Sequence, residues 1–328
     1  MALYKNQMVY RFMCIVLLVC LFIIPLGTVS IHAEATDTDS YTTEFTYNDL
    51  EYLIDTDSLT AVLAGSVSDE LKSLKIPSVI IYKEKEIPVT GIADYAFEGS
   101  SLTKVTIGKN VRTIGEGAFA FSSELIKVSV NKSCNRIGDA AFFMCEKLKT
   151  VKLSKKAKTS YIGEGALAGT AIKKFSIPDA TVTVGSAAFA ECPKLSSVNL
   201  GKKLNELGEG AFAGCNSLEK VSISDKNKSF TVKDNLIYSK DYEELLSAAA
   251  ASGEIRLSEE TESIACRAFE GNSRVVTVRI PESVASIEEC AFMSCSALET
   301  VILEGGMIEI DENAFYDCPG LKEMRLGG

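Results

Sequence analysis

The 328-residue chain contains no tryptophan and only one histidine, His32. His32 lies in an N-terminal segment that we expect to be removed, so the mature chain would offer no imidazole for a nucleophile pair or for general acid–base catalysis. The sequence also has no Cys-x-x-Cys pair for a metal and no glycine-rich phosphate-binding loop. These absences exclude most enzyme classes and predict neither a metal site nor a cofactor. A pair of carboxylates acting on a glycan is the remaining catalytic alternative.

The first 35 residues have the order of a secretory signal peptide. Lys5 and Arg11 precede an apolar run over residues 12–26, and small residues then lead to Ala33 and Ala35, after either of which cleavage would fit. An uncleaved N-terminal anchor is the alternative, but the run reaches the length of a membrane span only if proline and glycine are counted. We therefore predict export, with residues 1–35 as the signal peptide.

The remaining chain is acidic. Residues 36–328 carry 32 basic and 43 acidic side chains, a net charge of −11. A protein with this charge is soluble and binds nucleic acid or anionic membranes poorly. We expect a secreted or cell-surface protein with no nucleic-acid partner and no membrane insertion after signal cleavage.

A repeat of about 23 residues dominates the chain from residue 88 onward. Its marker is an Ala-Phe dipeptide, replaced once by Ala-Leu, and nine copies are readable with one long interruption. An aliphatic residue stands five positions before each marker, as at Ile114 and Ile137. The marker positions are Phe97, Phe119, Phe142, Leu167, Phe189, Phe212, Phe269, Phe292 and Phe315.

Most copies continue with the spacing L-x-x-V-x-L, as in Leu148, Val151 and Leu153. The last three positions alternate between core and solvent, which is the period of a strand. One unit of this size cannot bury its apolar side alone, but stacked units join their strands into a parallel sheet and their Ile and Phe positions into internal ladders. The sequence thus predicts a β-rich solenoid, with a parallel sheet on one face and short turns, 3-10 or helical segments on the other. Glycine follows the aliphatic position in five copies, including Gly115 and Gly185, which we interpret as the mark of a tight turn.

The recurring Ile-Gly-x-x-Ala-Phe-x-x-Cys-x-x-Leu-x-x-Val-x-Leu, seen in residues 137–153 and 207–223, resembles the BspA-type leucine-rich repeat of bacterial surface proteins. The resemblance covers residues 88–328 and implies a leucine-rich-repeat solenoid. It also implies adhesion to host matrix proteins or to other cells, although it assigns that role to no single residue. Residues 36–87 resemble the strand-rich start of such proteins, and we expect them to form an N-terminal β-rich cap over the first coil.

Two segments depart from the repeat. About 34 extra residues lie between Ser224 and Glu259, and their pattern predicts an inserted β-hairpin at about 225–256. The sequence ends at Gly327-Gly328, directly after the strand of the last copy. Either the strand of this last copy is left as an open edge, which favours end-to-end self-association, or the chain is a short or truncated family member.

Five of the eight cysteines after residue 35 stand three positions after the repeat marker. Ser, Thr or Asn occupies this position in the other copies, so buried thiols in a packing position are the favoured interpretation. Disulfides between adjacent coils, Cys192 with Cys215 or Cys295 with Cys318, are the alternative. Neighbouring strands lie about 4.8 Å apart, within reach of a disulfide, and export permits oxidation.

The two residues that flank the central apolar residue of each strand are expected to point out of the core. Seven of these eighteen side chains are basic and one is acidic, which gives a basic, hydroxyl-rich stripe on an acidic protein. Such a stripe serves either the binding of an anionic partner or the solubility of an open sheet. The candidate ligand-binding residues are Lys104, Thr106, Lys127, Ser129, Lys152, Lys174, Lys220, Arg279 and Arg325.

These observations lead to the hypothesis of a non-enzymatic binding or adhesion protein. It would recognise a host or cell-surface macromolecule, an extracellular protein or an anionic glycan, through the sheet face of the solenoid. A structural envelope or matrix protein that self-assembles through its last rung is the alternative. A glycan-processing enzyme with two carboxylates is more remote.

Overall fold

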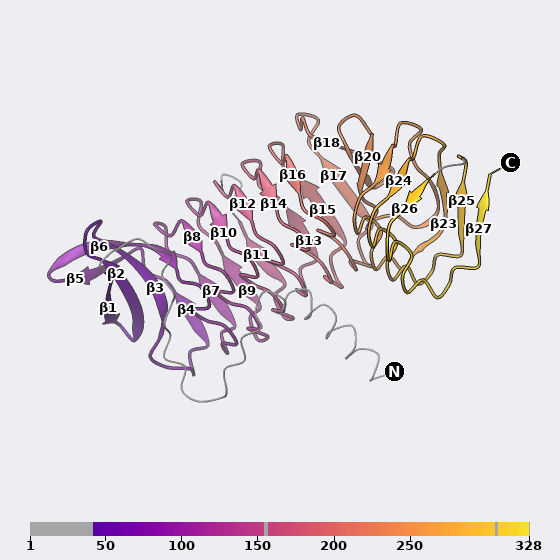
Figure 1. Ribbon diagram of the computed structural model, residues 1–328. Coiled ribbons are helices and arrows are strands. Elements are labelled where there is room, and N and C mark those ends of the chain that lie inside the picture. The colour runs from indigo at the N-terminus through magenta and orange to yellow at the C-terminus, as the bar shows by residue number, and fades with distance from the viewer. Residues whose placement is uncertain (1–41, 154–156, 306–307, 328) are drawn as a thin grey trace. The chain divides into compact units, whose positions relative to one another are not determined.

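The computed structural model describes residues 42–153, 157–305 and 308–327. The segment assigned to the signal peptide lies outside these ranges. The described chain is a β-solenoid in which each repeat forms one coil, and Figure 1 shows the coils following one another in chain order. The predicted solenoid with parallel strands is confirmed. The described ranges contain no helix, so strands and turns build the side on which the sequence allowed helical segments.

The first ladder consists of the strands in the L-x-x-V-x-L segments. They pair in parallel and form three successive sheets, because pairing is interrupted twice along the stack. The pattern of alternation is the expected one, since Val105 is buried between the exposed Lys104 and the half-buried Thr106. The sheets contain β4 (Ser73–Lys75), β7 (Lys104–Thr106), β9 (Lys127–Ser129) and β11 (Thr150–Lys152); β13 (Lys174–Ser176), β15 (Ser197–Leu200) and β17 (Lys220–Ile223); and β21 (Gly253–Arg256), β23 (Val275–Ile280), β25 (Thr300–Leu303) and β27 (Glu323–Leu326).

A second ladder, which the sequence did not predict, is formed by strands of only two residues. Each ends on the aliphatic residue that stands five positions before the marker, and the register places Ile114, Ile137 and Ile162 opposite one another. Two residues are too few to show a period, so the sequence pattern could not indicate these strands. They are β8 (Thr113–Ile114), β10 (Arg136–Ile137), β12 (Tyr161–Ile162), β14 (Thr183–Val184), β16 (Glu206–Leu207), β22 (Ser263–Ile264), β24 (Ser286–Ile287) and β26 (Glu309–Ile310).

The third side of each coil is the turn that carries the marker, which we call the aromatic turn. Successive turns are joined by main-chain hydrogen bonds, such as Phe119 N to Ala141 O at 2.9 Å and Phe121 N to Phe143 O at 2.7 Å. In all nine copies the residues two before and two after the marker have a positive φ. Left-handed residues at these two positions turn the backbone so that amides and carbonyls point along the stack, and the turn bonds to its neighbours in place of a strand.

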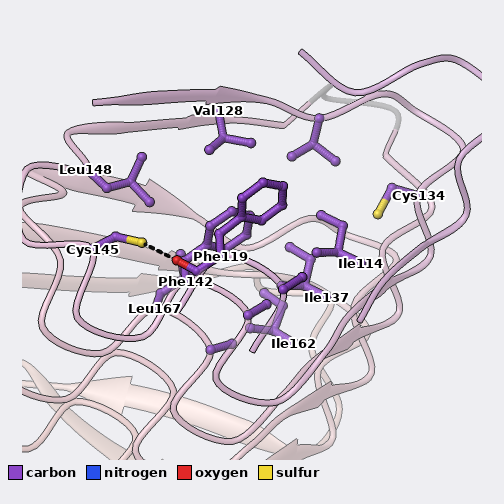
Figure 2. Close-up of a cluster of buried hydrophobic side chains, with 14 of the residues drawn as sticks. Ile114, Phe119, Val128, Cys134, Ile137, Phe142, Cys145, Leu148, Ile162 and Leu167 are labelled. Carbon is purple, nitrogen blue, oxygen red and sulfur yellow. Dashed lines mark hydrogen bonds between the residues drawn. The ribbon is translucent and has the colours of Figure 1, made fainter. Parts of the chain in front are cut away.

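The core runs through the interior of the coils as rows of apolar side chains from equivalent repeat positions. Figure 2 shows Ile114, Ile137 and Ile162 in one row, with Phe119 stacked on Phe142 beside them. The rings of Phe119 and Phe142 lie 5.4 Å apart and 3° from parallel. Both rings are fully buried, and burial of each contributes about 2 kcal/mol.

The glycines after the aliphatic residue do not serve the tight turn that we inferred from the sequence. None of the five has a left-handed φ. A Cβ at Gly185 would instead lie 2.5 Å from the backbone nitrogen of Glu164 in the preceding coil, and a Cβ at Gly138 would lie 2.7 Å from the carbonyl carbon of Gly115. The glycines are required because the backbones of adjacent coils approach too closely for a side chain.

The N-terminal segment is rich in strands and continues both ladders. β1 (Thr42–Tyr47), β2 (Leu50–Asp55) and β3 (Thr60–Ser66) form an antiparallel meander, and β5 (Val79–Tyr82) pairs antiparallel with β6 (Lys85–Ile92). β3 then pairs in parallel with β6, and β6 with β8, so the meander leads into the second ladder. β4 similarly begins the first ladder by pairing with β7.

The segment between Ser224 and Glu259 begins with a hairpin and ends as a shortened coil. β18 (Phe230–Lys233) and β19 (Leu236–Ser239) are antiparallel, and Asp234 and Asn235 between them both have a positive φ, as a type I′ turn requires. β20 (Glu244–Ser247) pairs with β22, and β21 pairs with β23, so the segment supplies a strand to each ladder.

This shortened coil has no aromatic turn of its own. Gly214 N, from the coil before the insertion, donates directly to Glu270 O in the coil after it, at 3.1 Å. Arg274 bridges the same junction by donating to the carbonyl oxygens of Leu218 and Ala249. The sheets that contain β16 and β17 end here, and those that contain β20 and β21 begin.

Candidate functional site

The outward positions of the first ladder bring the predicted lysines onto one sheet face. Lys104, Lys127, Lys152, Lys174 and Lys220 are all exposed. Thr106 and Ser129 are half-buried between their neighbours. Each side chain is held outward because the adjacent Val or Phe of its strand is anchored in the core.

The strand register determines which of these residues are neighbours. Lys104 stands opposite Lys127, and Thr106 opposite Ser129. Ser129 in turn stands opposite Lys152. In the next sheet Ser197 lies between Lys174 and Lys220.

One lysine of this face was missed by the sequence analysis. Lys75 in β4 is exposed, and its strand pairs with β7 so that Lys75 stands opposite Thr106. The signal was present, because Leu71, Leu74 and Ile76 follow the same spacing as the later strands, but we assigned the segment to the cap. The name lysine face is used below for Lys75, Lys104, Lys127, Lys152, Lys174 and Lys220.

The lysine face carries uncompensated charge. Within the described ranges, none of its six ammonium groups forms an ion pair with a carboxylate. Exposed lysines without a carboxylate partner leave a local positive potential, even on a protein whose net charge is negative.

The two arginines predicted for the stripe have a different environment. The Nε of Arg279 lies 2.8 Å from Glu254 Oε1 on the neighbouring strand, and the Nε of Arg325 lies 3.8 Å from Glu323 Oε1. Arg256 in β21, also missed from the sequence, contacts both Glu259 and Glu304 at 2.8 Å. Such exposed pairs add little stability, but they cancel the positive charge in this part of the ladder.

The comparison with protein families agrees with this architecture. The sequence profile of the BspA type leucine rich repeat region matches the chain in six copies, over residues 66–193, 160–240 and 248–328. The chain belongs to this family. No curated protein matches the whole sequence significantly.

Solved structures resemble the BspA-type repeat protein in fold. The pneumococcal vaccine antigen PcpA has a TM-score of 0.64 at 19 % identity, over 87 % of this chain and 82 % of PcpA. A leucine-rich repeat protein from Bacteroides ovatus has a TM-score of 0.65 at 24 % identity, over 87 % of this chain and 71 % of the other. A leucine rich cell surface protein from Faecalibacterium prausnitzii has a TM-score of 0.60 at 18 % identity, over 90 % and 96 %. At these identities the likeness establishes the fold alone.

The cysteines of this BspA-type protein are free thiols throughout the described ranges. Cys145 illustrates the repeat position, because its thiol donates to the carbonyl oxygen of Phe119 in the preceding coil at 3.1 Å (Figure 2). Burial raises the pKa of the Cys145 thiol to about 12. The thiol is therefore protonated at neutral pH and acts as a hydrogen-bond donor, not as a nucleophile.

Within residues 42–153, 157–305 and 308–327, the Cys, Asp and Glu side chains form no group of three or more that could hold a metal ion. The same residues include no apolar helix of the length needed to span a membrane.

Proposed function

We propose that this BspA-type protein is an extracellular binding protein that captures an anionic macromolecule on its lysine face. The observation that carries the proposal is the convergence onto one face of six exposed lysines from six strands of one ladder, none of which is paired with a carboxylate of the described residues. The solenoid fixes their relative positions, so a partner with matching negative charges meets a preorganised surface.

The decisive experiment compares salt-titrated binding of the exported protein to host matrix proteins and anionic glycans with that of a charge-reversed variant. The variant changes Lys104, Lys127, Lys152 and Lys220 to Glu. Binding should weaken as salt rises and should be lost in the variant, because the attraction depends on screened charges. Binding that is unchanged in the variant would contradict the proposal, and hydrolysis of a glycan would indicate the enzymatic alternative instead.

The control is a variant with the same change in net charge at four lysines outside the strand positions. Lys109, Lys132, Lys202 and Lys203 are exposed and lie in the turns that follow the strands. Their replacement by Glu should leave most of the binding intact. An equal loss in both variants would show that net charge matters and the sheet face does not.

Self-assembly is a second candidate function, favoured by the edge of β26 and β27. Within the described ranges these strands pair on one side only, with β24 and β25. Ile310, Met324 and Leu326 at this edge are 42 %, 41 % and 69 % exposed. An open edge with apolar side chains is a template for pairing.

Sedimentation at increasing concentration tests this second function. Self-assembly through the edge predicts larger species at higher concentration and their loss when Met324 and Leu326 are changed to Lys. A protein that is monomeric at every concentration would contradict it.

A further inference from the structure

The positive charge on the lysine face is arranged as a track that crosses the strands. In the sheet of β4, β7, β9 and β11 every strand carries at least one outward lysine, and Lys104 and Lys127 stand directly opposite each other. Adjacent strands lie about 4.8 Å apart, so positive charge recurs at that interval along the stacking direction of the coils.

Residues just before the strands extend the track on one side. Thr103 N donates to Lys72 O, and Lys149 N donates to Ile126 O, so these residues continue the same ladder one step earlier in the chain. Lys72 and Lys149 are both exposed. The four strands present four outward lysines over a length of about 14 Å, which is three strand spacings, and Lys72 and Lys149 add positive charge where the chain enters the sheet. Lys173, Lys174 and Lys220 continue the positive charge on the next sheet.

Hydroxyl groups fill the outward positions of this track that the lysines leave. Thr106 stands between Lys75 and Ser129 in one row, and Thr150 stands beside Lys127 in the other. A hydroxyl both donates and accepts hydrogen bonds, which suits a ligand that carries hydroxyl groups as well as acidic groups. Sugars in acidic polysaccharides have this combination.

The face lacks the features that a folded protein partner uses. Of the large hydrophobic side chains that are exposed in the described ranges, none lies within β4, β7, β9 or β11, and only Ile126 directly precedes one of these strands. Protein interfaces depend on a few aromatic or aliphatic anchors buried at their centre. Nucleic-acid surfaces add arginine and stacking aromatic rings, and the outward positions of these four strands have neither.

The distribution of charge confines an anionic ligand to this part of the solenoid. Residues 36–224 carry 22 basic and 23 acidic side chains, a net charge of −1, whereas residues 225–328 carry 10 and 20, a net charge of −10. The arginines of β21, β23 and β27 are paired with carboxylates. A polyanion is therefore attracted to the coils of β4 to β17 and repelled by those that follow.

We infer that the ligand of the lysine face is a linear acidic polysaccharide that lies across the strands, along the stacking direction of the coils from β4 toward β17. This inference rests on the proposed function and names its ligand class. A linear chain with sulfate or carboxylate groups at regular intervals can meet one lysine after another, whereas a compact anion can meet only one or two of them.

The experiment measures the affinity of the exported protein for size-fractionated heparin and polygalacturonate oligosaccharides at several salt concentrations. Affinity should rise with chain length and level off once the oligosaccharide exceeds the length of the ladder from β4 to β17, which is six strand spacings or about 29 Å. Neutral dextran of equal length should not bind. The slope of log affinity against log salt should become shallower in the variant with Lys75, Lys104, Lys127 and Lys152 changed to Gln, with an affinity loss of at least tenfold.

The matched control changes Lys109, Lys132, Lys202 and Lys203 to Gln, and it should retain both the affinity and the salt slope of the unmodified protein. Double-stranded DNA and an acidic protein are run beside the glycans. Equal affinity for short and long oligosaccharides, or tighter binding of DNA, would overturn the inference. Binding of an acidic protein but of no polysaccharide would overturn it while leaving the proposed function intact. No binding to any anionic probe would contradict both.

Discussion

The thiol of Cys215 donates a hydrogen bond of 2.9 Å to the carbonyl oxygen of Phe189 in the preceding coil. Every cysteine that stands three positions after a marker makes the same bond to the marker of the coil before it. Ser122 repeats it with an oxygen donor, to Phe97 O at 2.9 Å. The position therefore requires a short side chain with a proton to donate. Thr170 and Asn272 at this position also donate to carbonyl oxygens, Thr170 to Leu167 O of its own coil and Asn272 to Ala248 O and Ala251 O.

We expect the effect of replacing Cys215 to depend on whether the new side chain can donate a hydrogen bond. Cys215→Ala leaves the carbonyl of Phe189 without its side-chain donor, and we expect the free energy of unfolding to fall by about 1 kcal/mol. Cys215→Ser keeps a donor and should cost less. Urea unfolding of the two variants measures the difference, and equal losses would show that packing alone determines the residue.

The repeat cysteines should also resist chemical modification in the folded protein. Burial raises the pKa of the Cys215 thiol, and only the thiolate is alkylated. Iodoacetamide should therefore label Cys215 only after unfolding, as measured by mass spectrometry of peptides. A Cys192–Cys215 disulfide in the non-reduced digest would contradict the free thiols of the structure and support the alternative raised by the sequence.

The positive φ in the aromatic turn predicts opposite effects on stability for substitutions at the same position of two neighbouring copies. Gly165 and Ala187 occupy the same position, two residues before the marker, with φ of 56° and 52°. Gly165→Ala should destabilise the protein by about 1 kcal/mol because its Cβ meets no atom closer than 3.8 Å and the cost is that of the backbone conformation. Ala187→Gly relieves the same strain and should raise the midpoint of thermal unfolding.

Ala188→Gly is the control for this pair. Ala188 adjoins Ala187, is fully buried and has no positive φ. Its replacement should lower stability through lost burial and increased backbone entropy of the unfolded state. Three substitutions that change stability in the same direction would argue against a role for backbone strain.

Asn227 should be among the most sensitive polar residues. Its amide donates to Gly201 O and Leu204 O at 3.0 and 2.8 Å, and its side-chain oxygen accepts from Ser229 N and Phe230 N. It is 2 % exposed, so water cannot replace these bonds. Asn227→Ala should cost about 3 kcal/mol or more in denaturant unfolding. Asn205→Ala at an exposed position should change stability by less than about 0.5 kcal/mol. Similar losses of stability at the two positions would show that the four hydrogen bonds of Asn227 contribute little to stability.

The carboxyl group of Glu191 should make stability depend on pH. Burial, followed by the nearby charge of Glu270, raises the pKa of Glu191 to about 7. The side chain lies against Gly214, where a Cβ would stand 2.0 Å from Glu191 Oε1. Between the unfolded pKa near 4.5 and the folded value, the native state binds more protons than the unfolded state, so stability falls as pH rises through this window.

Glu191→Gln removes that titration. The variant should be more stable than the unmodified protein at pH 8 and should show a flatter dependence of the unfolding midpoint between pH 5 and 7. Glu146→Gln, at an exposed turn position, should leave the pH profile unchanged. A stabilisation by Glu191→Gln that is smaller at pH 8 than at pH 5 would contradict this pH dependence.

Much of the fold could be predicted from the sequence because its signals are local. The strands of the first ladder alternate residue by residue, so the burial of Val105 and Val128 and the exposure of Lys104 and Lys127 follow from the order of side chains. The marker and the aliphatic residue before it recur at a fixed distance, which identifies the coil and its internal rows. The same alternation led to the lysines of the candidate site.

Only the tertiary structure shows features that depend on neighbouring coils. The left-handed positions of the aromatic turn hold Tyr95, Arg267 and Cys290 as well as glycine, so residue type did not reveal them. Gly185 is required by the backbone of a coil about twenty residues earlier. Arg279 has its charge cancelled by Glu254, which lies on an adjacent strand of a different coil.

One physical cause separates the features that the sequence determines from those that only the tertiary structure decides. Side-chain order within a strand determines what is buried and what faces solvent, and the sequence contains all of that information. Contacts between coils join residues more than twenty positions apart through hydrogen bonds, close approach and charge. Those contacts depend on how the coils stack, and stacking at the insertion between β17 and β22 departs from the regular repeat.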